Sequence, residues 1–239
     1  MLSFVLLVLE WSAGEGASAA SAEISQRLYT QRAHSPLGIL QTRDNSIQHN
    51  TVNWILGKCP KILFVSREEW HAEESKNMSY LNVNGGVGLV FYHHTEGPEC
   101  NSTDSCAQIT RHWQKYHQET KGWDDIAYNF LIGGDGQVYE GRGFDRIGAH
   151  TLGYNTKSVS FGFVGNFTFH VPNNGMLAAA ADLILCGIKL GKLRVGYTLH
   201  GQRDANHRDC PGDAFYALIQ KDPHFGGRLH PYIYTPPQR

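Results

Sequence analysis

The sequence predicts an α/β domain in which a central mixed β-sheet is flanked by helices. Segments of strand and helix character alternate along the chain, as expected when helices pack on the faces of a sheet. Residues 88–93 (GLVFYH) form a short apolar run of the kind that makes a buried strand. Residues 134–136 (Gly-Asp-Gly) join segments 127–133 and 137–140 with turn chemistry that suits an antiparallel hairpin.

The helices are predicted from their caps and their apolar periodicity. Ser102 or Thr103 can cap a helix that carries Asp104 in its first turn. Its apolar stripe has helical spacing and comprises Cys106, Ile109, Trp113 and Tyr116. The remaining predicted elements are a strand at 158–164, a helix at 174–190 that stops at Gly191, a strand at 197–200 and a helix at 212–220.

Length and charge limit the classes of protein. The 239 residues, 41% of them hydrophobic, are enough for one domain with tails. The 21 basic and 22 acidic residues nearly balance, and no Lys/Arg run stands out. We therefore expect neither nucleic acid nor an anionic membrane as the main partner.

The N-terminus resembles a secretory signal peptide covering residues 1–22. Residues 2–9 are largely apolar, and Ala-Ser-Ala triplets at 17–19 and 20–22 offer cleavage sites. The segment lacks a basic start and carries Glu10, so an apolar tail is the alternative. It is too short for a transmembrane segment. Residues 23–57 read as a polar linker or arm, 58–225 as the domain and 226–239 as an extended tail.

Sequons and cysteines also indicate a secreted, extracellular glycoprotein. Asn77, Asn101 and Asn166 begin acceptor sequons for N-glycosylation. The five cysteines include Cys100 and Cys106, which bracket a short polar loop and could close it as a disulfide.

Cys59 and Cys186 could form a second bridge and leave Cys210 over. An odd cysteine in a secreted chain indicates an intermolecular bridge, a reactive thiol or a metal ligand. His93 ends the buried strand, and Cys210 lies in the loop that opens the last helix. Both side chains could bind zinc, although on spacing alone a core histidine and a buried thiol are the preferred explanation.

Several longer strings carry a family resemblance. They occur in this order: residues 90–95 (VFYHHT), the Cys100/Cys106 pair, residues 122–130 (GWDDIAYNF), residues 133–144 (GGDGQVYEGRGF), residues 148–150 (GAH) and residues 209–212 (DCPG). Together they resemble the peptidoglycan recognition proteins, animal relatives of the type-2 zinc N-acetylmuramoyl-L-alanine amidases, over residues 58–225. The resemblance implies that fold, two disulfides including Cys59–Cys186, and a role in innate immunity and defence against bacteria.

The implied activity is hydrolysis of the lactyl–L-alanine amide of peptidoglycan, that is, peptidoglycan catabolism. By resemblance, His93 and Cys210 match two zinc ligands, and Tyr128 matches a catalytic tyrosine that orients the water or stabilises the oxyanion. Gln202 stands where the amidases have the third ligand, a histidine. His200, which two residues earlier on a predicted strand would face the same side as Gln202, or His207 could complete the site instead.

The resemblance also implies a peptidoglycan-binding groove. The matching positions are His117, Lys121, Gly122, Trp123, Tyr128 and His150. Lys121 could pair with a carboxylate of the stem peptide, and the Gly122–Trp123 pair favours diaminopimelate-type over lysine-type peptide. Taken alone, His117 could equally be a solvated helix residue and Trp123 an ordinary core residue.

Two functions follow from these expectations. The first is a pattern-recognition protein that binds bacterial peptidoglycan and its muropeptides and has little or no hydrolytic activity, as Gln202 favours. The second is an active zinc amidase hydrolase, as Cys210 favours. Zn²⁺ therefore stays an open cofactor, and the sequence makes no prediction of oligomeric state.

Overall fold

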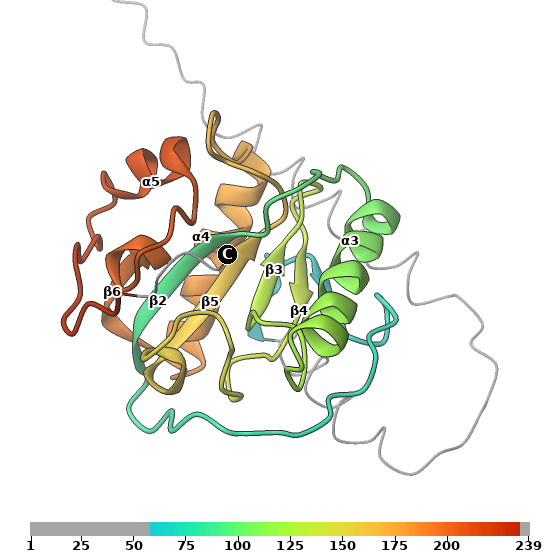
Figure 1. Ribbon diagram of the computed structural model, residues 1–239, viewed down its shortest axis with the longest axis horizontal. Coiled ribbons are helices and arrows are strands. Elements are labelled where there is room, and N and C mark those ends of the chain that lie inside the picture. The colour runs from blue at the N-terminus through green and yellow to red at the C-terminus, as the bar shows by residue number, and fades with distance from the viewer. Residues whose placement is uncertain (1–57, 235–239) are drawn as a thin grey trace, which may run out of the picture. The chain divides into compact units, whose positions relative to one another are not determined.

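The computed structural model describes residues 58–234, so the predicted signal peptide and the arm at 23–57 lie outside the described residues. A six-stranded sheet in the order β1-β4-β3-β5-β2-β6 forms the centre (Figure 1). Only β3 and β4 pair antiparallel among these strands, so the predicted mixed sheet and hairpin are confirmed. The strands are β1 (Phe64–Val65), β2 (Val87–His94), β3 (Phe130–Ile132), β4 (Val138–Glu140), β5 (Ser158–Phe163) and β6 (Leu193–Gly201).

Helices cover both faces of the sheet. The helices are α3 (Thr103–Lys115), α4 (Asn174–Lys189) and α5 (Asp213–Ile219), with a π-helical turn (Tyr116–Thr120) continuing α3 and 3-10 turns at Asn155–Lys157 and Gln202–Asp204. One core cluster joins α4 and α5 to the sheet, and a second joins α3 to the opposite side. Figure 1 accordingly shows α3 (green) and α4 (orange) on different sides of the strands.

Strand alternation decides which residues of β2 reach the α3 side. Val90 and Tyr92 belong to the core that holds α4 and α5. Successive side chains of a strand point to opposite faces. Phe91 and His93 therefore face the other side, where their rings lie 6.2 Å apart. This side carries the candidate site.

The capping prediction for α3 is confirmed, whereas its buried face differs from the apolar stripe. Ser102 caps the helix in a capping box. Ile109 and Trp113 are half-buried, whereas the polar residues Thr110 and Gln114 are buried. Gln114 tolerates burial because its amide donates to Asp125 and to a backbone carbonyl.

The C-terminal segment through Tyr234 packs on the domain although the sequence reads as an extended tail from residue 226. The amide of Leu229 donates to the carbonyl of Asp204, and the amide of Ile233 donates to that of Ala205. The Tyr154 hydroxyl donates to the carbonyl of Pro231 at 2.8 Å. Hydrogen bonds between distant backbone segments have no local signal in the sequence.

Both predicted disulfides are present. Cys59–Cys186 ties the start of the described chain to α4, and Cys100–Cys106 ties the loop after β2 to α3. Cys210 is the free cysteine and is buried. No helix within residues 58–234 combines the length and apolar character that a membrane crossing requires.

Candidate functional site

His93 and Cys210 meet at the carboxyl end of β2. The Nδ1 atom of His93 lies 3.3 Å from the Sγ atom of Cys210, although 117 residues separate them in sequence. Strand β2 delivers His93, and the loop between β6 and α5 delivers Cys210. Both side chains are more than 90% buried. The structure therefore brings together the two residues that the sequence marks as zinc ligands.

Burial sets the charge state of this pair. It lowers the pKa of His93 to about 3, with a smaller effect from His94. It raises the pKa of the Cys210 thiol to about 12 and outweighs the hydrogen bond to the His94 backbone and the charge of Arg203, which lower it. In this protein, both groups are therefore neutral near pH 7.

Tyr128 lies beside the pair. Its ring centroid is 5.5 Å from that of His93, and its hydroxyl lies 3.5 Å from the carbonyl oxygen of His94. Gly162 on β5 leaves room for this ring, because a Cβ atom there would lie 2.8 Å from two ring carbons. Burial raises the pKa of Tyr128, so its hydroxyl keeps its proton and remains available as a hydrogen-bond donor.

Neither alternative third ligand lies at the pair. His200 has both ring nitrogens engaged, at 2.9 Å from the Gly227 carbonyl oxygen and 2.8 Å from the Thr198 hydroxyl. His207 is exposed and stacks on Tyr234 at 5.1 Å between ring centroids. The expectation that His200 shares a strand face with Gln202 is wrong, because β6 ends at Gly201 and Gln202 begins a 3-10 turn.

Gln202 itself is turned toward the His150 segment. Its Nε2 atom donates to the carbonyl oxygen of His150 at 3.0 Å. Within residues 58–234, no group of three or more His, Cys, Asp or Glu side chains is arranged to hold a metal ion.

The donor set therefore fits zinc only in part. Tetrahedral zinc with Zn–N of about 2.0–2.1 Å and Zn–S of about 2.3 Å separates its nitrogen and sulfur ligands by about 3.6 Å. The 3.3 Å between His93 and Cys210 is close to that spacing. A catalytic zinc site needs three protein ligands, and Gln202, which the resemblance matches to the third, offers only a neutral amide. We therefore assign no catalytic step to a metal in this protein.

An aromatic row extends from His93 toward the end of α3. His117 lies 6.0 Å from Tyr128 between ring centroids and stacks on Trp123 at 5.0 Å and on Trp113 at 5.8 Å. The Nδ1 atom of His117 accepts the backbone amide of Ala127 at 3.2 Å. His117 is therefore a buried, fixed member of this row and not a solvated helix residue.

Gly122 and Trp123 line a pocket of about 290 Å³ next to this row. Its other lining residues are Ser79, Asp124, Arg142, Ile147, Gly148 and Ala149. Gly122 has a φ of 70°, which a glycine adopts without strain. Lys121 is exposed, and its ammonium lies 5.5 Å from the centroid of the Tyr116 ring.

Arg142 lines the pocket but is not among the residues predicted from the sequence. The signal that could have indicated it is its position between Gly141 and Gly143, directly after the hairpin. Its guanidinium donates to the carbonyl oxygens of Asp125, Ile126 and Ile147. A guanidinium has five N–H groups, so three such bonds leave donor capacity on the side chain. Arg142 can therefore bring positive charge and fixed hydrogen-bond donors to the pocket.

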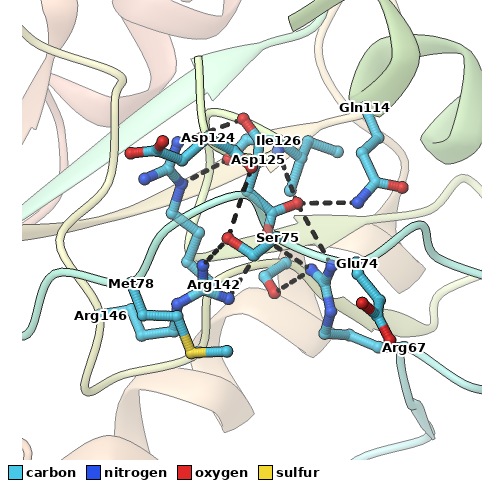
Figure 2. Close-up of polar contacts among 12 residues, drawn as sticks. Arg67, Glu74, Ser75, Met78, Gln114, Asp124, Asp125, Ile126, Arg142 and Arg146 are labelled. Atoms are coloured by element: carbon cyan, nitrogen blue, oxygen red, sulfur yellow. Dashed lines mark hydrogen bonds and ion pairs between the residues drawn. The ribbon is translucent and has the colours of Figure 1, made fainter. Parts of the chain in front are cut away.

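A buried ionic network supports the loop that carries these pocket residues (Figure 2). Asp125 is fully buried, and each of Arg67 and Arg146 approaches its carboxylate to 3.1 Å. Gln114 of α3 donates to the same carboxylate at 2.8 Å. Two guanidinium groups thus share one carboxylate, and the network also includes the acids Glu140, beside Arg67 and Arg146, and Asp124, beside Arg142.

His150 lies on the other side of His93, at 5.3 Å between ring centroids. Its Nδ1 atom lies 2.9 Å from the Thr151 hydroxyl. Burial and the neighbouring His93 hold the pKa of His150 well below its usual value. The predicted residues His93, Tyr128, His117, Trp123 and His150 therefore form one continuous group.

Comparison with known proteins places this geometry in a family. Residues 84–213 match the N-acetylmuramoyl-L-alanine amidase family. Peptidoglycan recognition protein 1 of Mus musculus is 45% identical over 162 residues, which cover 67% of this chain and 88% of the mouse protein. The N-acetylmuramoyl-L-alanine amidase of Homo sapiens is 42% identical over 148 residues, which cover 61% of this chain but only 26% of the human protein.

A solved structure agrees with these relatives. A mutant of Drosophila PGRP-LB in complex with tracheal cytotoxin superposes with a TM-score of 0.66 at 39% sequence identity. The match covers 68% of this chain and 95% of the Drosophila chain. The chain therefore belongs to the peptidoglycan recognition proteins of the N-acetylmuramoyl-L-alanine amidase family.

Proposed function

We propose that this protein is a secreted recognition protein that binds bacterial peptidoglycan without cleaving it. The observation that carries the proposal is a contrast between two sets of neighbouring residues. The residues that match the family's binding positions form a continuous group from Trp123 to His150, whereas Gln202, which matches the third zinc ligand, offers a neutral amide that hydrogen-bonds to the backbone.

The chemistry of the pocket favours a peptide with an extra carboxylate, as in diaminopimelate-type peptidoglycan. Trp123 supplies a flat apolar wall, and Gly122 adds no side chain beside it. Arg142 supplies the cation, and Lys121 is exposed nearby. A charged hydrogen bond between guanidinium and carboxylate is stronger and more directional than one between neutral groups. A lysine-type peptide presents an ammonium there, which the Arg142 guanidinium would repel; the Asp124 carboxylate, which also lines the pocket, already accepts a hydrogen bond from Asn77.

Several observations support secretion. Two disulfides persist in oxidising compartments and are rare in the cytosol. The sequon residues Asn77, Asn101 and Asn166 are all exposed, as acceptors of glycans must be.

Titration calorimetry with two muramyl tetrapeptides, identical except for diaminopimelate or lysine at the third position, tests the binding proposal. We expect the diaminopimelate ligand to bind about tenfold or more tightly, the effect of one charged hydrogen bond. Trp123→Ala should weaken binding, and Phe169→Ala, which removes an aromatic side chain that is 94% exposed and outside the groove, should not.

Two results would count against the proposal. If the folded wild-type protein binds neither muropeptide, recognition fails as its function. If both ligands bind equally, the preference for diaminopimelate fails while recognition stands.

One observation favours the amidase as a second candidate. The separation of His93 and Cys210 is within about 0.3 Å of that expected for two ligands of a tetrahedral zinc. Release of stem peptide from peptidoglycan by the wild-type protein with added zinc would favour hydrolysis over recognition alone.

A further inference from the structure

Four buried side chains form an unbroken chain of polar contacts through the centre of the site. The Sγ atom of Cys210 lies 3.3 Å from Nδ1 of His93, and Nε2 of His93 lies 3.3 Å from Oγ1 of Thr151. The same Oγ1 atom lies 2.9 Å from Nδ1 of His150. Each of the four residues is less than 9% exposed, so the chain is shielded from solvent.

The single hydroxyl proton of Thr151 links the tautomers of the two imidazoles, those of His93 and His150. Each ring is buried and therefore neutral, with one N–H and one lone pair. The hydroxyl of Thr151 has a single proton, so it donates to one ring and is free to accept from the other. If it donates to Nδ1 of His150, then Nε2 of His93 must carry a proton. If it donates to Nε2 of His93, then Nδ1 of His150 must carry one. Either way, full pairing requires the two rings to adopt the same tautomer.

Cys210 selects between these two arrangements. A thiol is both a weak donor and a weak acceptor, whereas an imidazole lone pair is a good acceptor. In the first arrangement, the S–H group donates to Nδ1 of His93 at 3.3 Å. In the second, an imidazole N–H is paired with sulfur, and the S–H group has only the carbonyl of His94 at 3.9 Å. The first arrangement therefore gives better pairing, with both rings protonated at Nε2.

The Nε2 atom of His150 is the end of this chain. It is buried and has no hydrogen-bond partner within residues 58–234. It lies beside Gly148, which lines the pocket, because a Cβ atom on Gly148 would be 3.1 Å from Nε2. An unpaired buried N–H is costly and rare, so its retention points to a ligand that pairs with it.

We propose that Thr151 is a positioning residue, which together with Cys210 and His93 fixes His150 as an Nε2–H donor to a carbonyl or carboxylate oxygen of the bound ligand. The muropeptide as ligand rests on the proposed function, whereas the tautomer of His150 does not. The proposal also gives Cys210 a role that needs no metal, namely to donate the hydrogen bond at the start of the chain.

Two-bond nitrogen–proton NMR spectra of the protein with 15N-labelled histidine, recorded at pH 7 without ligand, report each tautomer directly. In the wild type, we expect the Nε2–H form for both His93 and His150. Thr151→Val keeps the shape but removes the hydroxyl, and it should give His150 a mixture of tautomers. Thr151→Ser should restore the wild-type spectrum, and Cys210→Ser should keep it because the serine hydroxyl also donates a hydrogen bond. Cys210→Ala removes that donor, so His93 and His150 should each show a mixture of tautomers.

Binding gives the second measurement. Thr151→Val should weaken binding of the diaminopimelate muropeptide about tenfold, the effect of one hydrogen bond, and Thr151→Ser should restore it. The proposal is overturned if wild-type His150 is protonated at Nδ1, or if Thr151→Val leaves its tautomer unchanged. If the tautomers behave as expected but the wild type binds no muropeptide, the proposed function fails and the hydrogen-bond chain stands.

Discussion

Replacing Gln202 by His places an imidazole where the amidases carry their third zinc ligand. The substitution gives up one hydrogen bond, from the Gln202 amide to the His150 carbonyl, which costs about 1 kcal/mol of stability. In return, it can complete a set of two histidines and one cysteine around zinc. We expect the variant to bind one zinc ion per chain.

The expected size of the effect follows from the geometry. His93 and Cys210 are already about 0.3 Å from tetrahedral spacing, so zinc binding requires little movement of either. Partners outside the coordination shell contribute about 10–100-fold to metal affinity, and a direct ligand should contribute more. Gln202→His should therefore raise zinc affinity by at least about 100-fold. Zinc at 100 times its Kd would stabilise the fold by about 2.7 kcal/mol.

Competition with a chromophoric chelator at pH 7.5 measures the affinity, and metal analysis of the dialysed protein gives the stoichiometry. Gln202→Asn is the matched control, since it changes the side chain without adding a ligand. Adding Cys210→Ser to Gln202→His should abolish the gain. If the wild type holds stoichiometric zinc as tightly as Gln202→His, the argument from the missing ligand is refuted.

Three further predictions concern stability and the groove. Removing the Cys59–Cys186 bridge by double Ala substitution should lower the free energy of unfolding by up to about 5 kcal/mol, because it closes a loop spanning 127 residues; an unchanged urea midpoint would contradict this. Burial, with smaller effects from nearby cations, lowers the pKa of His117 from 6.5 to about 4, so protonation favours the unfolded chain. The neutral His117 should therefore contribute up to about 3 kcal/mol to the free energy of unfolding above pH 6.5, and this contribution should be lost as the pH falls to about 4. Urea titrations should show a smaller loss of unfolding free energy over this pH range in His117→Gln. Gly148→Ala would place a Cβ atom 2.4 Å from Cδ2 of His150, so it should displace the ring and weaken muropeptide binding about tenfold or more; wild-type affinity would contradict this.

The sequence predicts β2 to β5 and the three helices because each carries a local pattern, whereas the two-residue β1 is not predicted and β6 begins four residues before the predicted 197–200. The apolar run at β2 and the Gly-Asp-Gly turn are examples, and the N-cap residue Ser102 is another. The resemblance then marks His93, Tyr128 and Cys210, and the structure brings these three together.

The remainder depends on contacts between distant segments. Arg142 and Thr151 gain their roles from neighbours far away in the chain, and neither carries a local signal of those contacts. Gln114 reads as a surface residue of a helix, yet it is buried against Asp125. His200 fails as a substitute ligand because the strand ends one residue before Gln202, a boundary that a sequence pattern does not locate to one residue.

Co-sedimentation with insoluble diaminopimelate-type peptidoglycan, followed by chromatography of the supernatant, tests the central claim most directly. The wild-type protein with intact disulfides and added zinc is incubated with the polymer. The account predicts that the protein is found in the pellet and that no stem peptide is released. Protein that stays in the supernatant would contradict recognition, and released stem peptide would contradict the absence of hydrolysis.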